Sequence, residues 1–309
     1  MSDDEANHSA AQTSAPVRPG SERRFGGRRR FVLLVLVLVF AAAALGALKY
    51  YRFYYHVTQQ EVLHSVQHDT FEATIRASRS VRLQIYQQAN ASSQQLVLFT
   101  SGDGGWSPFC ADIAAHVAST GRTVVGFDSK DYLTTFSSSD NPVSPEQIAR
   151  DYEDVMSASR RRAGVNSDAP IVLSGWSLGA GYSILAASAV QSKASVDRVV
   201  AISLPLRNEL AWKASDALIY ITHGTPHEKV FDSRDYIARL GKTPVAILNA
   251  SDDDNAPVKD AQLLFDATVG PRKLFVIKAS GHHFEGGEQT FYQRLDDAFD
   301  SNLSFEPSR

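Results

Sequence analysis

The chain has 309 residues and a formal net charge of -3, and 43% of its residues are hydrophobic and 21% are charged. This length and composition can bury a sizeable core, which excludes a disordered or fibrous protein. The negative net charge gives no excess of basic residues for binding phosphates, so we expect no nucleic acid as a partner. Its single cysteine, Cys110, excludes an internal disulfide and a metal site built on paired cysteines, and we expect it to be a buried structural thiol.

An uncharged apolar segment, residues 31–48, follows a polar N-terminal tail. As a helix it is long enough to cross the hydrocarbon core of a bilayer. The cationic residues before it are Arg23, Arg24, Arg28, Arg29 and Arg30, whereas only Lys49 and Arg52 follow closely. This bias predicts that residues 1–30 form a disordered cytoplasmic tail, that 31–48 is a transmembrane anchor, and that the body lies across the membrane. A cleaved signal peptide is the alternative.

The body begins at residue 71 in this prediction and extends to 309, with 49–70 as a linker or stalk. Short β-rich runs alternate with helical runs over this region, which is typical of an α/β sheet, and the later strands are apolar enough for a parallel sheet covered by helices on both faces. The expected strands are 81–87, 96–100, 123–127, 171–174, 199–203, 218–221, 245–249 and 274–278, and the expected helices are 109–119, 145–162, 178–191, 258–267 and 288–299.

The pentapeptide Gly-Trp-Ser-Leu-Gly at 175–179 matches the nucleophile elbow G-x-S-x-G. A β-rich run leads into it and a helical run leads out, and its small residues let strand and helix approach closely. The serine hydroxyl is then exposed on a strained turn. This context predicts an α/β-hydrolase fold with a mostly parallel sheet, and Ser177 as its nucleophile.

A serine nucleophile needs a base to take its proton, and the base needs an acid to orient it. In this fold the acid and then the histidine follow the serine along the chain. The acidic run 252–254 follows one expected strand, and its middle residue, Asp253, has the usual spacing before Pro257. Two histidines follow the last expected strand. We favour His282 as the base because Gly-His-x-Phe is the commoner arrangement, and His283 is the alternative.

Acyl transfer also needs two hydrogen-bond donors for the developing oxyanion. One is expected to be the backbone N–H of Leu178, directly after the nucleophile. The other is expected from the glycine-rich loop 100–106, where the N–H of Asp103 follows a glycine. This chemistry requires no cofactor and no metal.

Four motifs together resemble the VirJ/AcvB family of bacterial virulence proteins. They are SGDGGW at 101–106, VVGFDS at 124–129, GWSLGA at 175–180 and GHHF at 281–284. The likeness spans roughly residues 95 to 300. The resemblance implies a periplasmic protein with a fold like that of the α/β-hydrolases. It also implies one of two functions: hydrolysis of lysyl-phosphatidylglycerol, an aminoacylated membrane lipid, or a supporting role in type IV secretion and virulence. The family usually carries an aspartate where this chain has Gly181.

We therefore expect a periplasmic serine hydrolase that cleaves an ester and is held at the bacterial inner membrane by a single pass. Its partners would be an ester or lipid substrate and the membrane, through residues 31–48. The carboxylates of Asp103, Asp128 and Asp131 lie beside the expected site and would attract a cationic lysyl head group. One alternative is a hydrolase-fold scaffold or accessory factor for a virulence or type IV secretion complex, with envelope secretion components as partners. The other is a general carboxylesterase or thioesterase.

Overall fold

The computed structural model describes residues 26–54, 65–76, 79–88, 95–138, 140–167, 169, 171–189, 196–212, 229–300 and 302–307. The chain divides into two compact units, Met1–Phe53 and Tyr54–Arg309.

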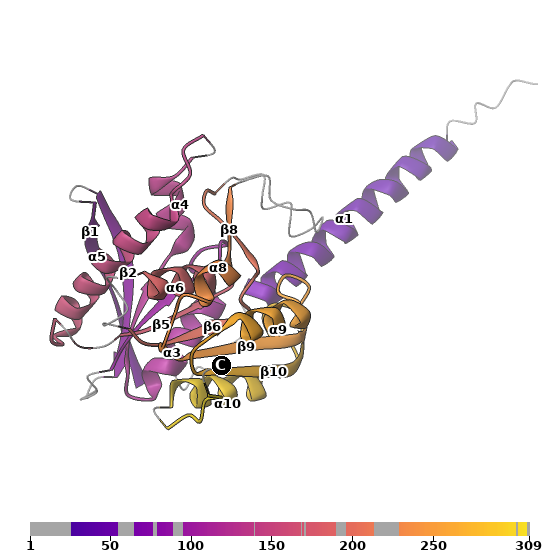
Figure 1. The fold of residues 1–309 in the computed structure, drawn as a ribbon. Helices are drawn as coiled ribbons and strands as arrows, with labels where there is room; N and C mark the ends of the chain where they lie inside the picture. The colour runs from indigo at the N-terminus through magenta and orange to yellow at the C-terminus, as the bar shows by residue number, and fades with distance from the viewer. Residues whose placement is uncertain are drawn as a thin grey trace, which may run out of the picture. The chain divides into compact units, whose positions relative to one another are not determined.

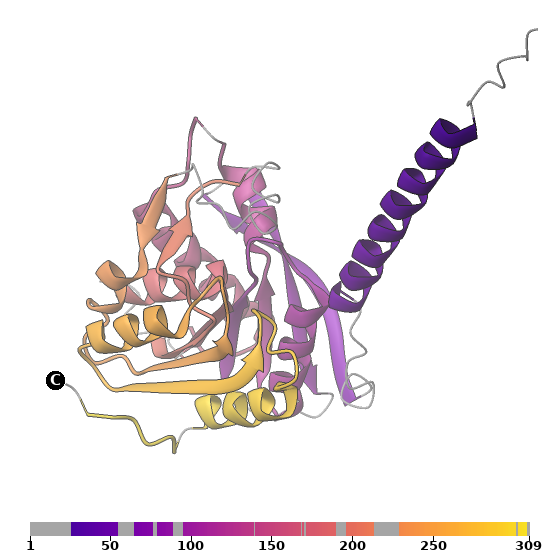
Figure 2. The ribbon, with the colours of Figure 1, turned by 90° about the vertical axis from the view of Figure 1, so that its right-hand side faces the viewer.

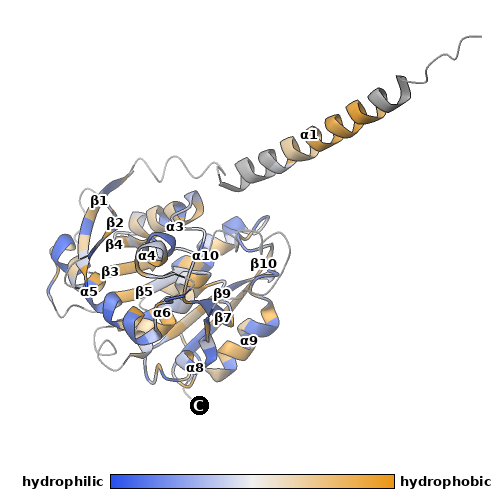
Figure 3. Ribbon diagram, turned by 90° about the horizontal axis from the view of Figure 1, so that it is seen from above, coloured by the Kyte–Doolittle hydropathy of each residue, from blue (hydrophilic) through white to orange (hydrophobic). Residues whose placement is uncertain are grey.

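The described residues of the first unit lie in helix α1 (Gly26–Tyr54), which includes the segment expected to be a membrane anchor (Figure 1). Its residues 31–46 are all exposed, and Figure 3 shows this stretch in the hydrophobic colour. Across the described parts of the chain, no helix is both long enough and apolar enough to cross a membrane.

The second unit is built on an eight-stranded sheet with the order β1-β2-β4-β3-β5-β6-β9-β10. Its strands are β1 (Val66–Ile75), β2 (Arg79–Gln88), β3 (Leu96–Thr100), β4 (Thr123–Phe127), β5 (Ile171–Trp176), β6 (Val196–Ile202), β9 (Val245–Asp252) and β10 (Arg272–Ser280). Strand β2 pairs antiparallel with both β1 and β4, and all other neighbours are parallel. The parallel strands therefore end at one edge of the sheet, where the loops that follow them meet.

Helices cover both faces of this sheet. One face carries α3 (Pro108–Ser119) and α10 (Glu288–Phe299), and the other carries α5 (Pro145–Ala163), α6 (Leu178–Ser188), α8 (Ser233–Ile237) and α9 (Val258–Ala267). In Figure 2 the yellow α10 and the orange α9 lie on opposite sides of the last strands. Alternate residues of β5 face opposite ways, so Ile171 and Leu173 pack in one apolar cluster and Val172 in the other. The prediction of a mostly parallel sheet between helices is confirmed.

The structure also contains elements that the sequence did not predict. Strand β1 begins at Val66, inside the segment assigned to a linker or stalk, and helix α4 (Ser129–Phe136) directly follows β4. A small ribbon of β7 (Arg207–Glu209) and β8 (Val230–Asp232) forms a second sheet. The strand expected at 218–221 lies outside the described residues.

Candidate active site

Ser177 lies on the turn between β5 and α6, and its backbone is strained. Its φ is 56° and its ψ is −125°, a backbone conformation that residues other than glycine rarely adopt. Its N–H donates to the carbonyl of Ile202 at 2.9 Å, which ties the turn to the neighbouring strand. The surrounding structure therefore holds the serine in the conformation of a nucleophile elbow.

Two glycines make this turn possible. A Cβ at Gly179 would lie 2.2 Å from the carbonyl oxygen of Thr100, and one at Gly175 would lie 2.2 Å from the carbonyl carbon of Gly179. Both distances are far inside van der Waals contact, so only glycine lets β5, α6 and the end of β3 approach this closely.

An acid–histidine pair lies on the two loops after β9 and β10. Nδ1 of His282 is 2.7 Å from Oδ2 of Asp253, and both side chains are buried. The other carboxylate oxygen, Oδ1, accepts the N–H groups of Asn255 and Ala256 at 2.9 and 3.0 Å. Burial alone would raise the pKa of Asp253, but the hydrogen bond and charge of His282, together with the amide of Ala256, hold that pKa below its usual value. The carboxylate therefore stays ionised and orients the imidazole.

The residues next to Asp253 and His282 in the sequence do not take part in this pair. Asp252 and Asp254 are exposed. The ring of His283 packs edge-on against the rings of Phe109 and Trp176, with centroids 4.9 and 4.5 Å apart. Burial, with the charge of the neighbouring histidine, lowers the pKa of His283 to about 3. Its imidazole is therefore neutral at physiological pH and belongs to the wall of the site.

Backbone and side-chain bonds join the three loops. Trp176, one residue before the serine, donates its indole N–H to the carbonyl of His282 at 3.0 Å, and its ring packs against that imidazole. The N–H of Gly281 donates to the carbonyl of Asp252 at 2.9 Å. Sequence reasoning assigned no role to Trp176, because the variable position of the motif carries no signal. These bonds bring Ser177, Asp253 and His282 to the same edge of the sheet.

The second ring nitrogen of His282, Nε2, is buried, and no described residue forms a hydrogen bond with it. This is the atom that a general base uses toward a serine hydroxyl. In free enzymes such contacts are often long and shorten only when substrate binds. The arrangement therefore leaves a proton acceptor available beside the elbow.

The loop after β3 passes beside the nucleophile. A side chain at Gly102 would come within 2.9 Å of the Trp176 ring and 3.4 Å of Cβ of Ser177. Asp103 follows directly, so its N–H is close to the elbow. Leu178 is the first residue of α6, where backbone N–H groups have no acceptor within the helix. Both residues expected to donate to an oxyanion therefore adjoin Ser177.

The three carboxylates expected near the site differ in their roles. Asp128 caps α4, because its side chain accepts the N–H groups of Lys130 and Asp131 at 2.9 and 3.0 Å and that of Trp106 at 3.0 Å. Asp131 is exposed. Asp103 reaches solvent in part, but protein surrounds its carboxyl group, and this burial raises its pKa to about 6. Asp103 is thus the carboxylate of the three whose pKa also responds to the charge of His282, which lowers it.

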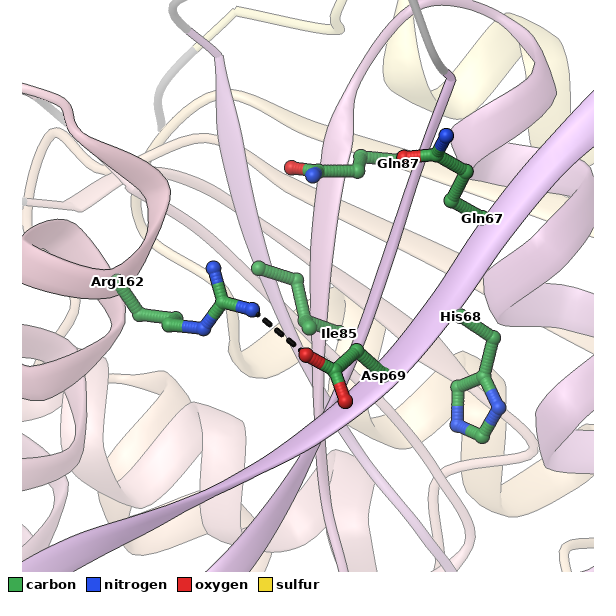
Figure 4. Close-up of a pocket in the computed structure, with 6 residues that line it drawn as sticks. All are labelled: Gln67, His68, Asp69, Ile85, Gln87 and Arg162. Atoms are coloured by element: carbon green, nitrogen blue, oxygen red, sulfur yellow. Dashed lines mark hydrogen bonds and ion pairs between the residues drawn. The ribbon is translucent and has the colours of Figure 1, made fainter.

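A hollow of about 370 Å³ lies elsewhere, on the β1–β2 hairpin and the end of α5 (Figure 4). It is lined by Gln67, His68, Asp69, Ile85, Gln87 and Arg162. Asp69 and Arg162 form an ion pair at 2.8 Å across it. None of its lining residues belongs to the three loops described above, so it is separate from the candidate active site.

Comparisons with known proteins agree with this fold. The family described as "Bacterial virulence protein (VirJ)" matches residues 94–303. No curated protein matches the chain.

Several solved structures are similar to this chain over almost their whole length. DcsB in complex with its substrate analogue has 15% identity and a TM-score of 0.59, covering 77% of this chain and 99% of that one. The dienelactone hydrolase from Anabaena variabilis has 15% identity and a TM-score of 0.55, covering 76% and 98%. Est1E from Butyrivibrio proteoclasticus has 13% identity and a TM-score of 0.53, covering 74% and 96%. At such identities the likeness shows the fold alone, which is that of the α/β-hydrolases.

Proposed function

Because the chain belongs to the bacterial virulence protein (VirJ) family, and because a buried acid–histidine pair adjoins its nucleophile elbow, we propose that it is a serine esterase. The observation that carries the proposal is the 2.7 Å hydrogen bond between Nδ1 of His282 and Oδ2 of Asp253. This bond fixes the histidine with its other nitrogen available as a base. Ser177, on the strained turn, is the nucleophile.

In the first half of the reaction, Oγ of Ser177 attacks the carbonyl carbon of the ester while its proton passes to Nε2 of His282. The negative charge that develops on the carbonyl oxygen is stabilised by the N–H groups of Leu178 and Asp103. The ionised Asp253 stabilises the imidazolium. The carbon–oxygen bond to the alcohol then breaks, and His282 returns the proton to the departing alkoxide, which leaves an acyl group on the serine.

Water completes the cycle. His282 takes a proton from the water as its oxygen attacks the acyl carbon, and the same two amides stabilise the second oxyanion. The bond to Oγ of Ser177 breaks, and the imidazolium returns its proton to the serine. A carboxylic acid leaves, and the protein regains its starting state.

Labelling with a fluorophosphonate probe tests the nucleophile. The wild type is expected to be labelled, and Ser177→Ala is expected to lose the label. Ser159→Ala, a buried serine of α5 whose hydroxyl donates to the carbonyl of Val155 at 2.7 Å, is the control that keeps the label. Absence of label on folded wild-type protein would reject the esterase and favour a scaffold for an envelope secretion complex.

We further propose that the substrate is an aminoacylated phospholipid such as lysyl-phosphatidylglycerol. The support is the partly buried carboxyl group of Asp103 beside the site, which suits an ammonium group next to the ester. Purified protein is expected to release lysine from vesicles of lysyl-phosphatidylglycerol faster than it cleaves a neutral carboxylic ester or thioester, and Asp103→Asn is expected to reduce that preference. Equal rates on all three substrates would instead indicate a general carboxylesterase or thioesterase.

We also propose that α1 attaches the protein to the bacterial inner membrane, with the second unit in the periplasm. The support is the uncharged stretch 31–46, exposed on every side, and the excess of arginines before it. The full chain is expected to remain with membranes after an alkaline wash, whereas Leu36→Glu combined with Leu38→Glu releases it. Recovery of the wild type in the soluble fraction would reject the attachment, and protease protection in intact spheroplasts would reject the periplasmic orientation.

A further inference from the structure

Two fully buried serines, Ser101 and Ser129, lie behind the loop that passes the nucleophile. Ser101 follows β3, and Ser129 begins α4, which comes after the adjacent strand β4. The hydroxyl of Ser129 donates to the carbonyl of Gly102 at 2.7 Å, and its backbone N–H donates to Oγ of Ser101 at 3.0 Å. Oγ of Ser101 lies 3.2 Å from the same carbonyl oxygen and 3.3 Å from Oγ of Ser129. The Ser101–Ser129 pair therefore converges on one backbone carbonyl.

That carbonyl is held from a second direction as well. The N–H of Gly105 donates to the oxygen of Gly102 at 2.9 Å, and the next residue of the loop, Trp106, donates its N–H to Asp128 at 3.0 Å. The loop is thus fastened at both ends to the turn between β4 and α4. Buried hydroxyl and carbonyl groups cost free energy unless they are paired, so this network holds the loop in one conformation.

The carbonyl of Gly102 and the N–H of Asp103 belong to the same peptide group. A trans peptide is planar, and its C=O and N–H point in opposite directions. The structure has no cis peptide bond in its described residues. Fixing the carbonyl toward Ser129 therefore fixes the N–H of Asp103 in the opposite direction, away from Ser129.

We propose that Ser129, assisted by Ser101, is a positioning residue that sets the direction of the Asp103 amide as an oxyanion donor. The inference rests on the proposed esterase function and assigns this orienting role to a hydroxyl that does not touch substrate. A hydrogen-bond donor stabilises an oxyanion most when it already points at the position of the oxyanion before the charge develops. Reorienting the donor during the reaction would cost free energy and offset the stabilisation. Without the Ser129 hydroxyl, only the bond from Gly105 and the longer contact with Ser101 would hold the carbonyl, so the peptide would rotate more freely.

The test measures hydrolysis of a p-nitrophenyl ester by Ser129→Ala in the full chain. The kcat is expected to fall by about 10- to 100-fold with KM within about twofold, since the lost interaction acts in the transition state. The affinity for an alkyl boronic acid, whose adduct with Ser177 carries the oxyanion charge, is expected to fall in parallel with kcat.

The matched control is Ser159→Ala, which removes an equally buried hydroxyl whose proton goes to a backbone carbonyl at 2.7 Å in α5. It is expected to lower the melting temperature about as much and to leave kcat unchanged. If Ser129→Ala does not fold, Ser101→Ala is measured in its place and is expected to show a smaller fall of kcat in the same direction, because its contact with the carbonyl is longer.

The outcomes distinguish a failure of the positioning role from a failure of the proposed esterase function. A folded Ser129→Ala or Ser101→Ala with wild-type kcat and boronic acid affinity, in a protein that Ser177→Ala inactivates, overturns the positioning role alone. Equal losses of kcat in the Ser159→Ala control also overturn it, because they indicate a general loss of structure. A wild type that neither hydrolyses the ester nor reacts with fluorophosphonate rejects the proposed function itself.

Discussion

Two regions of the second unit contain a carboxylate paired with a basic side chain at almost the same distance, in opposite surroundings. At the carboxyl edge of the parallel strands, the His282–Asp253 pair is 2.7 Å long, and its side chains are 7% and 0% exposed. On the β1–β2 hairpin, the Arg162–Asp69 pair is 2.8 Å long, and its side chains are 38% and 67% exposed. Water screens the second pair but not the first, so distance alone says little about what a charged pair contributes.

The difference extends to the groups around each pair. At the carboxyl edge of the parallel strands, Asp253 accepts two further N–H groups, and Nε2 of His282 is buried with no partner among the described residues. On the hairpin, both members of the pair, Asp69 and Arg162, are exposed to water. A buried polar group left with an open position is costly to fold, whereas an exposed one is not. These features favour the carboxyl edge as the active site, although the hollow of about 370 Å³ is on the hairpin.

The largest expected effect separates the two adjacent histidines. His282→Gln removes the base held by Asp253, and we expect kcat on a p-nitrophenyl ester to fall by about 10⁴-fold or more. His283→Gln keeps a polar side chain of similar size in the wall of the site, and we expect kcat within about tenfold of the wild type, a difference below ~1.4 kcal/mol. The two variants are matched in chemistry and differ by one position in the chain.

The pH profile sharpens this comparison. Burial holds the pKa of His283 at about 3, so its ring carries no charge across the working range, and His283→Gln is expected to leave the shape of the profile unchanged. If instead His283→Gln abolished turnover and His282→Gln did not, the assignment of the base from the hydrogen bond to Asp253 would be wrong.

A smaller effect is expected at Asp103, and it depends on pH. Burial raises the pKa of this carboxyl group from 3.8 to about 6, so the folded protein keeps a proton that the unfolded chain has already released. Stability therefore falls as pH rises from about 4 to about 6. Asparagine does not ionise, so Asp103→Asn is expected to be more stable than the wild type at pH 7.5. The gain should be about 1 kcal/mol, because partial exposure reduces the full value of the shift.

Urea unfolding at pH 4 and pH 7.5 measures this difference, which should be much smaller at pH 4. Asp254→Asn is the control, because it makes the same substitution at an exposed aspartate. A loss of stability in Asp103→Asn at pH 7.5 would mean that the protein stabilises the ionised carboxylate, and it would remove the argument for a buried, readily neutralised acid at the site.

Much of the sheet and of the loops at its carboxyl edge could be predicted because these elements are local. Each parallel strand is a short apolar run, and the loops after β5, β9 and β10 carry polar residues in a fixed order along the chain. Strand β1 was missed because most of its side chains are exposed and polar, which hides it from a search for apolar runs. Helix α4 was missed because eight residues with few apolar positions give a weak periodic signal.

The contacts that orient the site could not be predicted, because they join residues far apart in the chain. The bond from Trp176 to the carbonyl of His282 spans 106 positions, and that from Ser129 to Gly102 spans 27. Gly181 is another case. A Cβ there would lie 2.1 Å from Oδ1 of Asn208, so this residue of the ribbon strand β7 fills the space that a side chain at position 181 would need. No pattern in the sequence reveals which distant residue occupies such a space.

The smallest expected effect is on the hairpin. Arg162→Ala removes the exposed pair with Asp69, and we expect the free energy of unfolding to change by less than ~1 kcal/mol, because exposed ion pairs are screened by water and salt. Turnover of a p-nitrophenyl ester should remain within about twofold of the wild type, equivalent to less than ~0.5 kcal/mol in the barrier. Urea unfolding and ester hydrolysis measure both quantities, with Asp253→Asn, which disrupts the buried pair of nearly equal length, measured alongside and expected to lose most of its activity. A fall in turnover in Arg162→Ala comparable to that in Asp253→Asn would mean that the hollow takes part in catalysis, and burial would no longer distinguish the functional pair from the structural one.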